Sequence, residues 1–121
     1  MHRLWQVDDH YRWLELSERT VARAEGWSFE GFLHPEDALA AYAAGAPRPT
    51  VILMDYFLGG TYGDAATEAI RTVDEVVVIV GHSSVPSCSE RIVLAGGNLS
   101  LPKHTGPNGI NPDLLAYLDR W

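Results

Sequence analysis

Three aspartates and one lysine stand directly after apolar stretches of this 121-residue chain: Asp8, Asp9, Asp55 and Lys103. Three carboxylates within a few ångströms repel one another unless a cation or a proton lies among them. Oxygen ligands of this kind suit Mg²⁺, which keeps several waters and accepts one or two carboxylates together with a phosphate. A lysine supplies a compact positive charge for a phosphoryl oxygen, and a carboxylate can attack a phosphoryl group to form an acyl phosphate. If these side chains meet, they predict an aspartate that accepts a phosphoryl group.

Five apolar segments that alternate with helical patterns would bring these residues together. The predicted strands are residues 3–7, 27–33, 50–54, 75–80 and 98–103. The predicted helices lie within residues 14–24, 36–45, 63–73, 87–97 and 111–121, and Asp64 and Asn111 are the expected N-caps of two of them. Such strand–helix units connect parallel strands, with helices on both faces. The prediction is an α/β fold with an open (βα)5 parallel sheet, in which ligands bind at the carboxyl ends of the strands.

The composition limits the partners. The net charge of −7 argues against nucleic acid and against anionic membrane surfaces, which both attract clustered lysine and arginine. Cys88 is the single cysteine, so no intramolecular disulfide forms, and a lone thiol fits a reducing compartment. No apolar stretch approaches the ~18–20 residues of a membrane span, and the first residues lack the apolar core of a signal peptide. We expect a cytoplasmic, single domain over residues 1–121.

Three motifs carry a resemblance to a known family. VDD (7–9), VILMDYFLGGTYG (51–63) and LPK (101–103), in this order and spacing, resemble the receiver (CheY-like) domain of two-component response regulators. The resemblance covers essentially the whole chain. It implies a flavodoxin-like sheet with strand order 2-1-3-4-5. It also implies a phosphohistidine donor on a sensor histidine kinase or phosphotransfer protein, and a downstream protein partner.

The resemblance assigns roles to individual residues. Asp55 would be the phosphoacceptor and would also contribute to the metal site. Asp9 would ligate Mg²⁺ directly, Asp8 would assist, often through water, and Phe57 would contribute its backbone carbonyl. Lys103 would contact the phosphoryl group. Slow self-hydrolysis of the acyl phosphate would follow, without the turnover of an enzyme.

The chain departs from the family where the phosphorylated state is normally sensed. The family usually has threonine or serine at the end of the fourth strand. Counting back from Lys103 without gaps places Gly81 there, whereas a shift of one or two residues brings in Ser83, and both alternatives stay open. Ser100 stands where the family has an aromatic side chain, and His104 replaces the usual proline. These departures question the switch more than the acceptor chemistry.

Other interpretations remain. A receiver that has lost its switch would be an interaction module that binds partners independently of phosphorylation. A phosphohydrolase with an aspartate nucleophile typically has an acid two residues further on, where this chain has Phe57. Asp8 and Asp9 could instead cap a helix, His82 and His104 lack metal-like spacing, and the four tryptophans fit packing better than a cofactor site. A homodimer, and whether the chain acts alone or within a longer protein, stay open.

Overall fold

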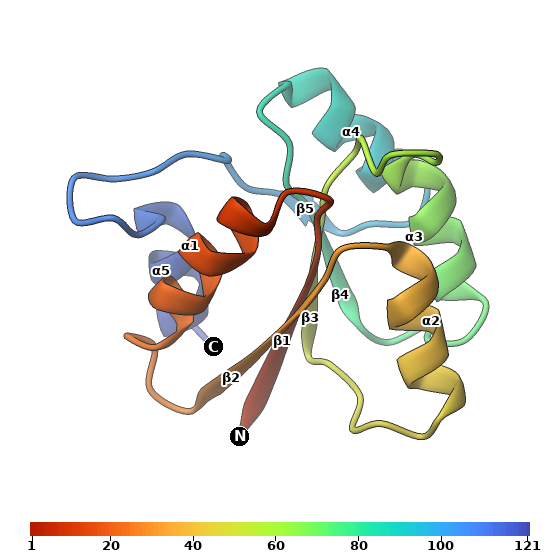
Figure 1. Cartoon of the computed structure of the whole chain (residues 1–121), viewed down its shortest axis with the longest axis horizontal. Coiled ribbons are helices and arrows are strands. Elements are labelled where there is room, and N and C mark those ends of the chain that lie inside the picture. The colour runs from red at the N-terminus through yellow and green to blue at the C-terminus, as the bar shows by residue number, and fades with distance from the viewer.

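The computed structural model describes every residue from Met1 to Trp121 and shows five strands and five helices that alternate along the chain (Figure 1). The strands are β1 (His2–Val7), β2 (Trp27–Phe32), β3 (Val51–Met54), β4 (Val78–Gly81) and β5 (Leu99–Ser100). The helices are α1 (Tyr11–Val21), α2 (Pro35–Ala43), α3 (Gly63–Arg71), α4 (Pro86–Leu94) and α5 (Pro112–Asp119). All strand pairs are parallel, in the order β2-β1-β3-β4-β5. The predicted flavodoxin-like α/β fold is confirmed.

Helices cover both faces of the sheet. α1 and α5 lie on one face, and α2, α3 and α4 lie on the other (Figure 1). All four residues of β3 are buried, because successive side chains of a strand point to opposite faces and each face meets a helix layer. Two apolar clusters result. Leu4, Leu53 and Val80 pack with residues of α1 and α5, whereas Ile52 and Ile79 pack with residues of α2, α3 and α4.

The fourth strand begins later than predicted. Residues 75–77 do not join β4, and Val76 is 89% exposed. The side chain of Asp74 is the reason, because its Oδ1 accepts hydrogen bonds from the amides of Val76 and Val77, each at 3.0 Å. Amides used in this turn are not available for the strand ladder. The run of valines was therefore an incorrect guide to the strand boundary.

Two helix starts test the capping predictions. Asn111 caps α5 as predicted, since its Oδ1 accepts hydrogen bonds from the amides of Asp113 and Leu114. The prediction that Asp64 caps α3 is wrong. Tyr62 occupies the N-cap position, and Asp64 lies within the first turn, where its Oδ1 accepts from the amide of Ala65. An acidic side chain there still interacts favourably with the helix dipole.

The fifth strand is shorter than the predicted 98–103. Leu99 and Ser100 pair with β4, and the amide of Leu101 still donates to the Gly81 carbonyl at 3.0 Å. Pro102 has no amide hydrogen, so the ladder ends there. The chain then forms a long loop as far as Asn111.

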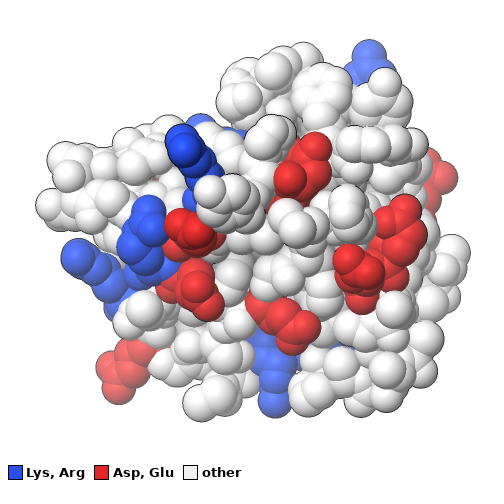
Figure 2. Space-filling model, in the orientation of Figure 1, with Lys and Arg blue, Asp and Glu red and all other residues white.

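Acidic and basic side chains are both present on the face shown in Figure 2, and most of the visible basic ones gather near α1. The helices are all too short or too polar to cross a membrane.

Candidate functional site

The carboxyl ends of the central strands place the predicted residues at one edge of the sheet. The strand ladder continues past β1 and β3, because the amide of Asp55 donates to the Val7 carbonyl at 3.0 Å and the amide of His82 donates to the Met54 carbonyl at 2.8 Å. Asp55 therefore extends β3 by one residue, and His82 extends β4 by one residue, at the same edge of the sheet as Asp8. In parallel strands, residues that follow the strand ends lie side by side. Asp8, Asp55 and His82 each come directly after a strand, so strand pairing brings them to the same edge.

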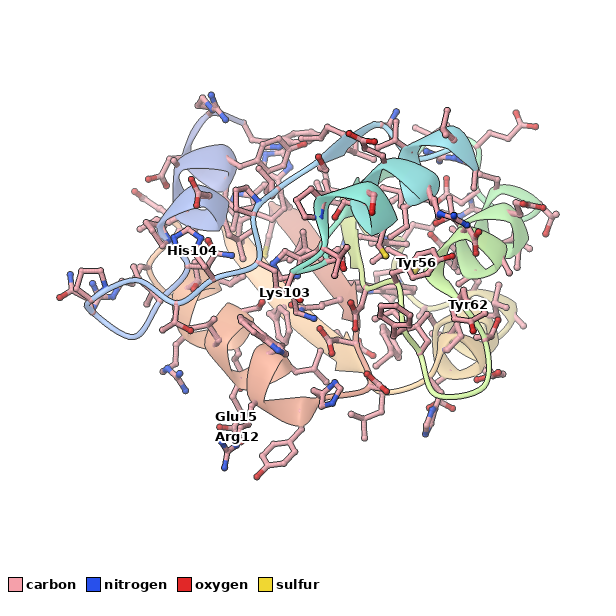
Figure 3. The ribbon with its side chains drawn as sticks, turned by 90° about the horizontal axis from the view of Figure 1, so that it is seen from above. Arg12, Glu15, Tyr56, Tyr62, Lys103 and His104 are labelled. Carbon is pink, nitrogen blue, oxygen red and sulfur yellow. The ribbon has the colours of Figure 1, made fainter.

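Lys103 lies between two of the predicted carboxylates. Its Nζ is 2.8 Å from Asp8 Oδ2 and 3.2 Å from Asp55 Oδ1. The side chains are almost fully buried, with 5% of Lys103, 0% of Asp8 and 7% of Asp55 exposed. In a view from above, Lys103 lies near the middle of the molecule, with Tyr56 and Tyr62 to one side and His104 to the other (Figure 3). The predicted convergence of carboxylates and ammonium is thus present.

Burial and charge change the acidity of Asp55. Loss of water around the carboxyl and, to a smaller extent, the neighbouring Asp8 carboxylate together raise its pKa from 3.8 to about 6. The Lys103 ammonium and a hydrogen bond from the Tyr56 amide to Oδ1, at 2.8 Å, oppose this rise. The raised pKa means that these favourable contacts do not fully offset the burial of the carboxyl and the Asp8 charge.

The donor set fits a divalent cation. Asp8, Asp9, His10 and Asp55 each offer one ligand atom, and these atoms lie within 4.8 Å of one another. Three carboxylates with one ammonium leave two negative charges, which a divalent ion balances. Asp9 Oδ1 is buried and forms no hydrogen bond, although His10 Nδ1 lies 2.8 Å from it. A buried oxygen without a hydrogen-bond donor is costly.

The loop after β3 borders the same site. Phe57 and Tyr62 form an antiparallel bridge, and the Tyr62 ring stacks on Tyr56 with centroids 5.2 Å apart. Phe57 is half-exposed and lines, together with Asp9, a hollow of about 430 Å³. Behind the loop, α3 approaches the strand end closely, because a Cβ at Gly63 would overlap the Asp55 carbonyl oxygen. The sequence marks this position only as a glycine.

At Gly81, one of the two positions where the family's hydroxyl could fall, helix packing leaves no space for a side chain. Gly81 pairs with Ser100 across the β4–β5 ladder. A Cβ at Gly81 would lie 2.7 Å from the backbone oxygen of Ser89, so α4 occupies the space of any side chain there. Ser83 is buried nearby, where its Oγ accepts from the Val85 amide at 3.2 Å. Ser83, Ser100 and Lys103 line a pocket of about 260 Å³.

One aromatic neighbour of Lys103, Trp13, was not predicted as a site residue. The Lys103 Nζ lies 4.9 Å from the ring centroid of Trp13, a cation–π distance. The Trp13 ring also meets His82 edge-on, with centroids 6.4 Å apart. In the sequence, Trp13 falls one helical turn after the VDD motif, which places it near the strand ends. A tryptophan by itself, however, indicates a packing residue rather than a site residue.

His82 and His104 differ in their surroundings. Burial and, to a smaller extent, the Lys103 charge together lower the pKa of His82 to about 3. This imidazole is therefore neutral and lies 3.4 Å from Asn111 Nδ2. His104 is half-exposed, and its Nδ1 lies 3.1 Å from Asp113 Oδ2. The acidic cluster includes neither histidine.

No protein-family model matches the chain, and neither does any curated protein sequence. Solved structures do match it. The BeF3-activated receiver domain of DrrB from Thermotoga maritima is 19% identical, with 99% of this chain and 96% of that chain covered and a TM-score of 0.78. A CheY-like receiver domain protein from Methanospirillum hungatei is 18% identical, with coverages of 99% and 95% and a TM-score of 0.77. The Mn²⁺-bound response regulator Rcp1 is 15% identical, with coverages of 99% and 91% and a TM-score of 0.76.

Identities this low establish the architecture alone. The shared strand order, the coverage of nearly the whole chain and the position of the acidic cluster at the strand ends agree with one another. The chain has the fold of the CheY-like receiver domains of response regulators.

Proposed function

We propose that this chain is a response regulator receiver that accepts a phosphoryl group on Asp55 in a Mg²⁺-dependent reaction. One observation carries the proposal: a buried lysine bridges two carboxylates from different strands, at 2.8 and 3.2 Å, beside a third carboxylate. A buried cluster of this net charge is unfavourable for folding alone. Binding of a cation and a phosphoryl group would explain why the chain has such a cluster.

The two oxygens of Asp55 have different tasks in this mechanism. Oδ1 accepts from the Tyr56 amide and lies beside Lys103 Nζ. Oδ2 therefore keeps a free lone pair for attack on phosphorus. An O–P bond forms, the P–N bond of the donor phosphohistidine breaks, and its electron pair returns to the imidazole. The Lys103 ammonium stabilises the negative charge on the transferring oxygens.

Asp9 and Asp8 would hold Mg²⁺, together with Asp55 and the backbone carbonyl of Phe57. The bound ion supplies charge neutralisation for the phosphoryl oxygens. Asp9 is the most accessible of the three carboxylates, and its Oδ1 has no hydrogen-bond donor. It is therefore the first ligand that we assign. Asp8 is fully buried and already paired with the lysine, which fits an assisting role.

Ser83 is the hydroxyl that we assign to the phosphoryl group. Gly81 offers no side chain, and the packing of α4 leaves no space for one. Ser83 and Lys103 face the same pocket, so a small movement of the loop after β4 brings the hydroxyl toward the group held by the lysine.

Acetyl phosphate tests the acceptor directly. Incubation with acetyl phosphate and Mg²⁺ should add the mass of one phosphoryl group to the wild type and none to Asp55→Asn. Asp74→Asn is the matched control, because Asp74 is also a buried aspartate but lies at the amino end of β4. It should be phosphorylated like the wild type. Absence of any mass gain in the wild type would refute the proposal.

A second candidate is a receiver-like interaction module that has lost its switch. The packing of α4 against Gly81 and the small side chain of Ser100 favour it, because both remove the usual conformational coupling. Such a module would bind its partner equally well with and without phosphorylation. A tenfold change in affinity on phosphorylation, about 1.4 kcal/mol, would exclude this candidate.

A further inference from the structure

His10 is the one non-carboxylate member of the acidic cluster. Its backbone amide donates to Asp8 Oδ1 at 3.0 Å, which holds the residue against the strand end. Its Nδ1 lies 2.8 Å from Asp9 Oδ1 and 3.8 Å from Asp8 Oδ1. The ring therefore faces the same two carboxylates that we assign to the metal. The side chain is 69% exposed, so most of the ring faces solvent.

The contact between His10 and Asp9 does not have the geometry of a hydrogen bond. Nδ1 and Oδ1 are close, yet Asp9 Oδ1 has no hydrogen-bond partner. His10 is the N-cap residue of α1, and its side chain makes no capping hydrogen bond. The ring thus has no structural task in the helix. The nitrogen and the buried oxygen both belong to the group of ligand atoms that lie within 4.8 Å of one another.

Metal–ligand distances set how far the two atoms must move. Ligands at about 2.0–2.2 Å from a tetrahedral zinc ion are about 3.3–3.6 Å apart. The observed 2.8 Å between Nδ1 and Oδ1 is shorter than this spacing, so the two atoms must move slightly apart to share an ion. A small rotation of the exposed ring places its nitrogen and the Asp9 oxygen on one ion without movement of the backbone.

We propose that His10 Nδ1 is an additional metal ligand, which gives the site a preference for a divalent transition ion such as Zn²⁺ over Mg²⁺. Imidazole is a good ligand for zinc and other late transition ions, whereas Mg²⁺ prefers oxygen and dehydrates reluctantly. This proposal rests on the metal site of the proposed function. It does not need phosphoryl transfer to Asp55.

Equilibrium binding of metal ions tests the proposal. Zn²⁺ and Mg²⁺ affinities of the unphosphorylated full chain would be measured by calorimetry at pH 8 for the wild type, His10→Ala and His104→Ala. His104 is the matched control, because it is also exposed beside a carboxylate but lies outside the cluster. We expect His10→Ala to bind Zn²⁺ at least tenfold more weakly, with Mg²⁺ affinity within twofold of wild type. His104→Ala should leave both affinities unchanged.

Spectroscopy gives a readout that a structural role would not change. Pulsed electron paramagnetic resonance of bound Mn²⁺ should show an imidazole nitrogen coupling in the wild type and in His104→Ala, and none in His10→Ala. Unchanged Zn²⁺ affinity in His10→Ala would overturn the proposal, as would equal losses of Zn²⁺ and Mg²⁺ affinity. These measurements use the metal alone, so a failure of Asp55 to accept a phosphoryl group leaves them interpretable.

Discussion

Removal of the Asp55 charge should stabilise the fold. The pKa of Asp55 in the folded chain is raised to about 6, first by burial and then by the Asp8 carboxylate. The folded state therefore holds the proton more tightly than the unfolded state between pH 3.8 and 6. The stability that this proton confers is fully present below the ordinary pKa and is lost as pH rises through 6. Above that pH the ionised carboxylate destabilises the folded chain.

The magnitude follows from the two pKa values. The difference between 3.8 and about 6 corresponds to about 3 kcal/mol, because one pKa unit is about 1.4 kcal/mol. Asp55 is almost fully buried, so solvent screens this energy little. Asn has nearly the same shape as Asp and no charge. The stability advantage of Asp55→Asn should grow by about 1–2 kcal/mol from pH 5 to pH 8 and then level off.

Urea unfolding in the presence of a chelator is the appropriate assay, since divalent ions would mask the repulsion. Free energies of unfolding would be compared at half-unit steps between pH 5 and pH 8.5. Asp74→Asn is the control, because loss of this charge should lower the stability rather than raise it. Burial favours the neutral form of Asp74, but hydrogen bonds from Val77, Tyr42 and Val76 outweigh it and lower the pKa. This variant should lose stability by the same amount throughout that pH range.

A constant difference between Asp55→Asn and the wild type from pH 5 to pH 8 would refute this reasoning. So would an advantage that shrinks as pH rises. Either result would mean that Lys103 and the Tyr56 amide fully offset the burial of the Asp55 carboxyl and the Asp8 charge.

Three further predictions follow from the packing around the site. Gly81→Ala should lower the free energy of unfolding by about 1–3 kcal/mol in urea titrations, because the new Cβ would lie 2.7 Å from the α4 backbone. Gly31→Ala is the control: its Cβ would meet only a leucine side chain, so the free energy of unfolding should change by less than about 1 kcal/mol. Phe57→Asn should accelerate dephosphorylation severalfold in a phosphate-release assay, because the wild-type apolar ring hinders the attacking water. Beryllofluoride with Mg²⁺ should change tryptophan fluorescence in the wild type and in Trp27→Phe, but not in Trp13→Phe, because the Trp13 ring lies 4.9 Å from the site lysine.

Strand positions and the acidic cluster could be predicted because both depend on local sequence patterns. The apolar segment VILM is buried on both faces of a sheet, and a charged residue directly after it falls at the strand end. Parallel pairing then aligns Asp55 with Asp8 without further information. The Asp8 and Asp55 contacts of Lys103 follow because β5 ends at the same edge. The site could be predicted from the sequence because each of its residues follows the end of a strand within a few residues.

Features that depend on neighbouring layers could not be predicted. The late start of β4 results from hydrogen bonds to the Asp74 side chain, which a run of valines does not reveal. The role of Gly81 depends on the distance of α4 from the sheet, which the sequence does not encode locally. Trp13 looked like a packing residue because the lysine beneath it is distant in sequence.

The proposed acceptor groups and the candidate sensing groups occupy different parts of the sheet edge, and their packing in this chain differs. The carboxylates and Lys103 are held by β1, β3 and the segment after β5, where the residues match the receiver pattern. On the β4–β5 side, α4 fills the space at Gly81, and Ser100 provides no ring. A phosphoryl group on Asp55 would compete with the carboxylates for Lys103, which also lies against the Trp13 ring of α1. We therefore expect a response to phosphorylation at the α1 surface, in addition to the movement of Ser83 in the loop after β4.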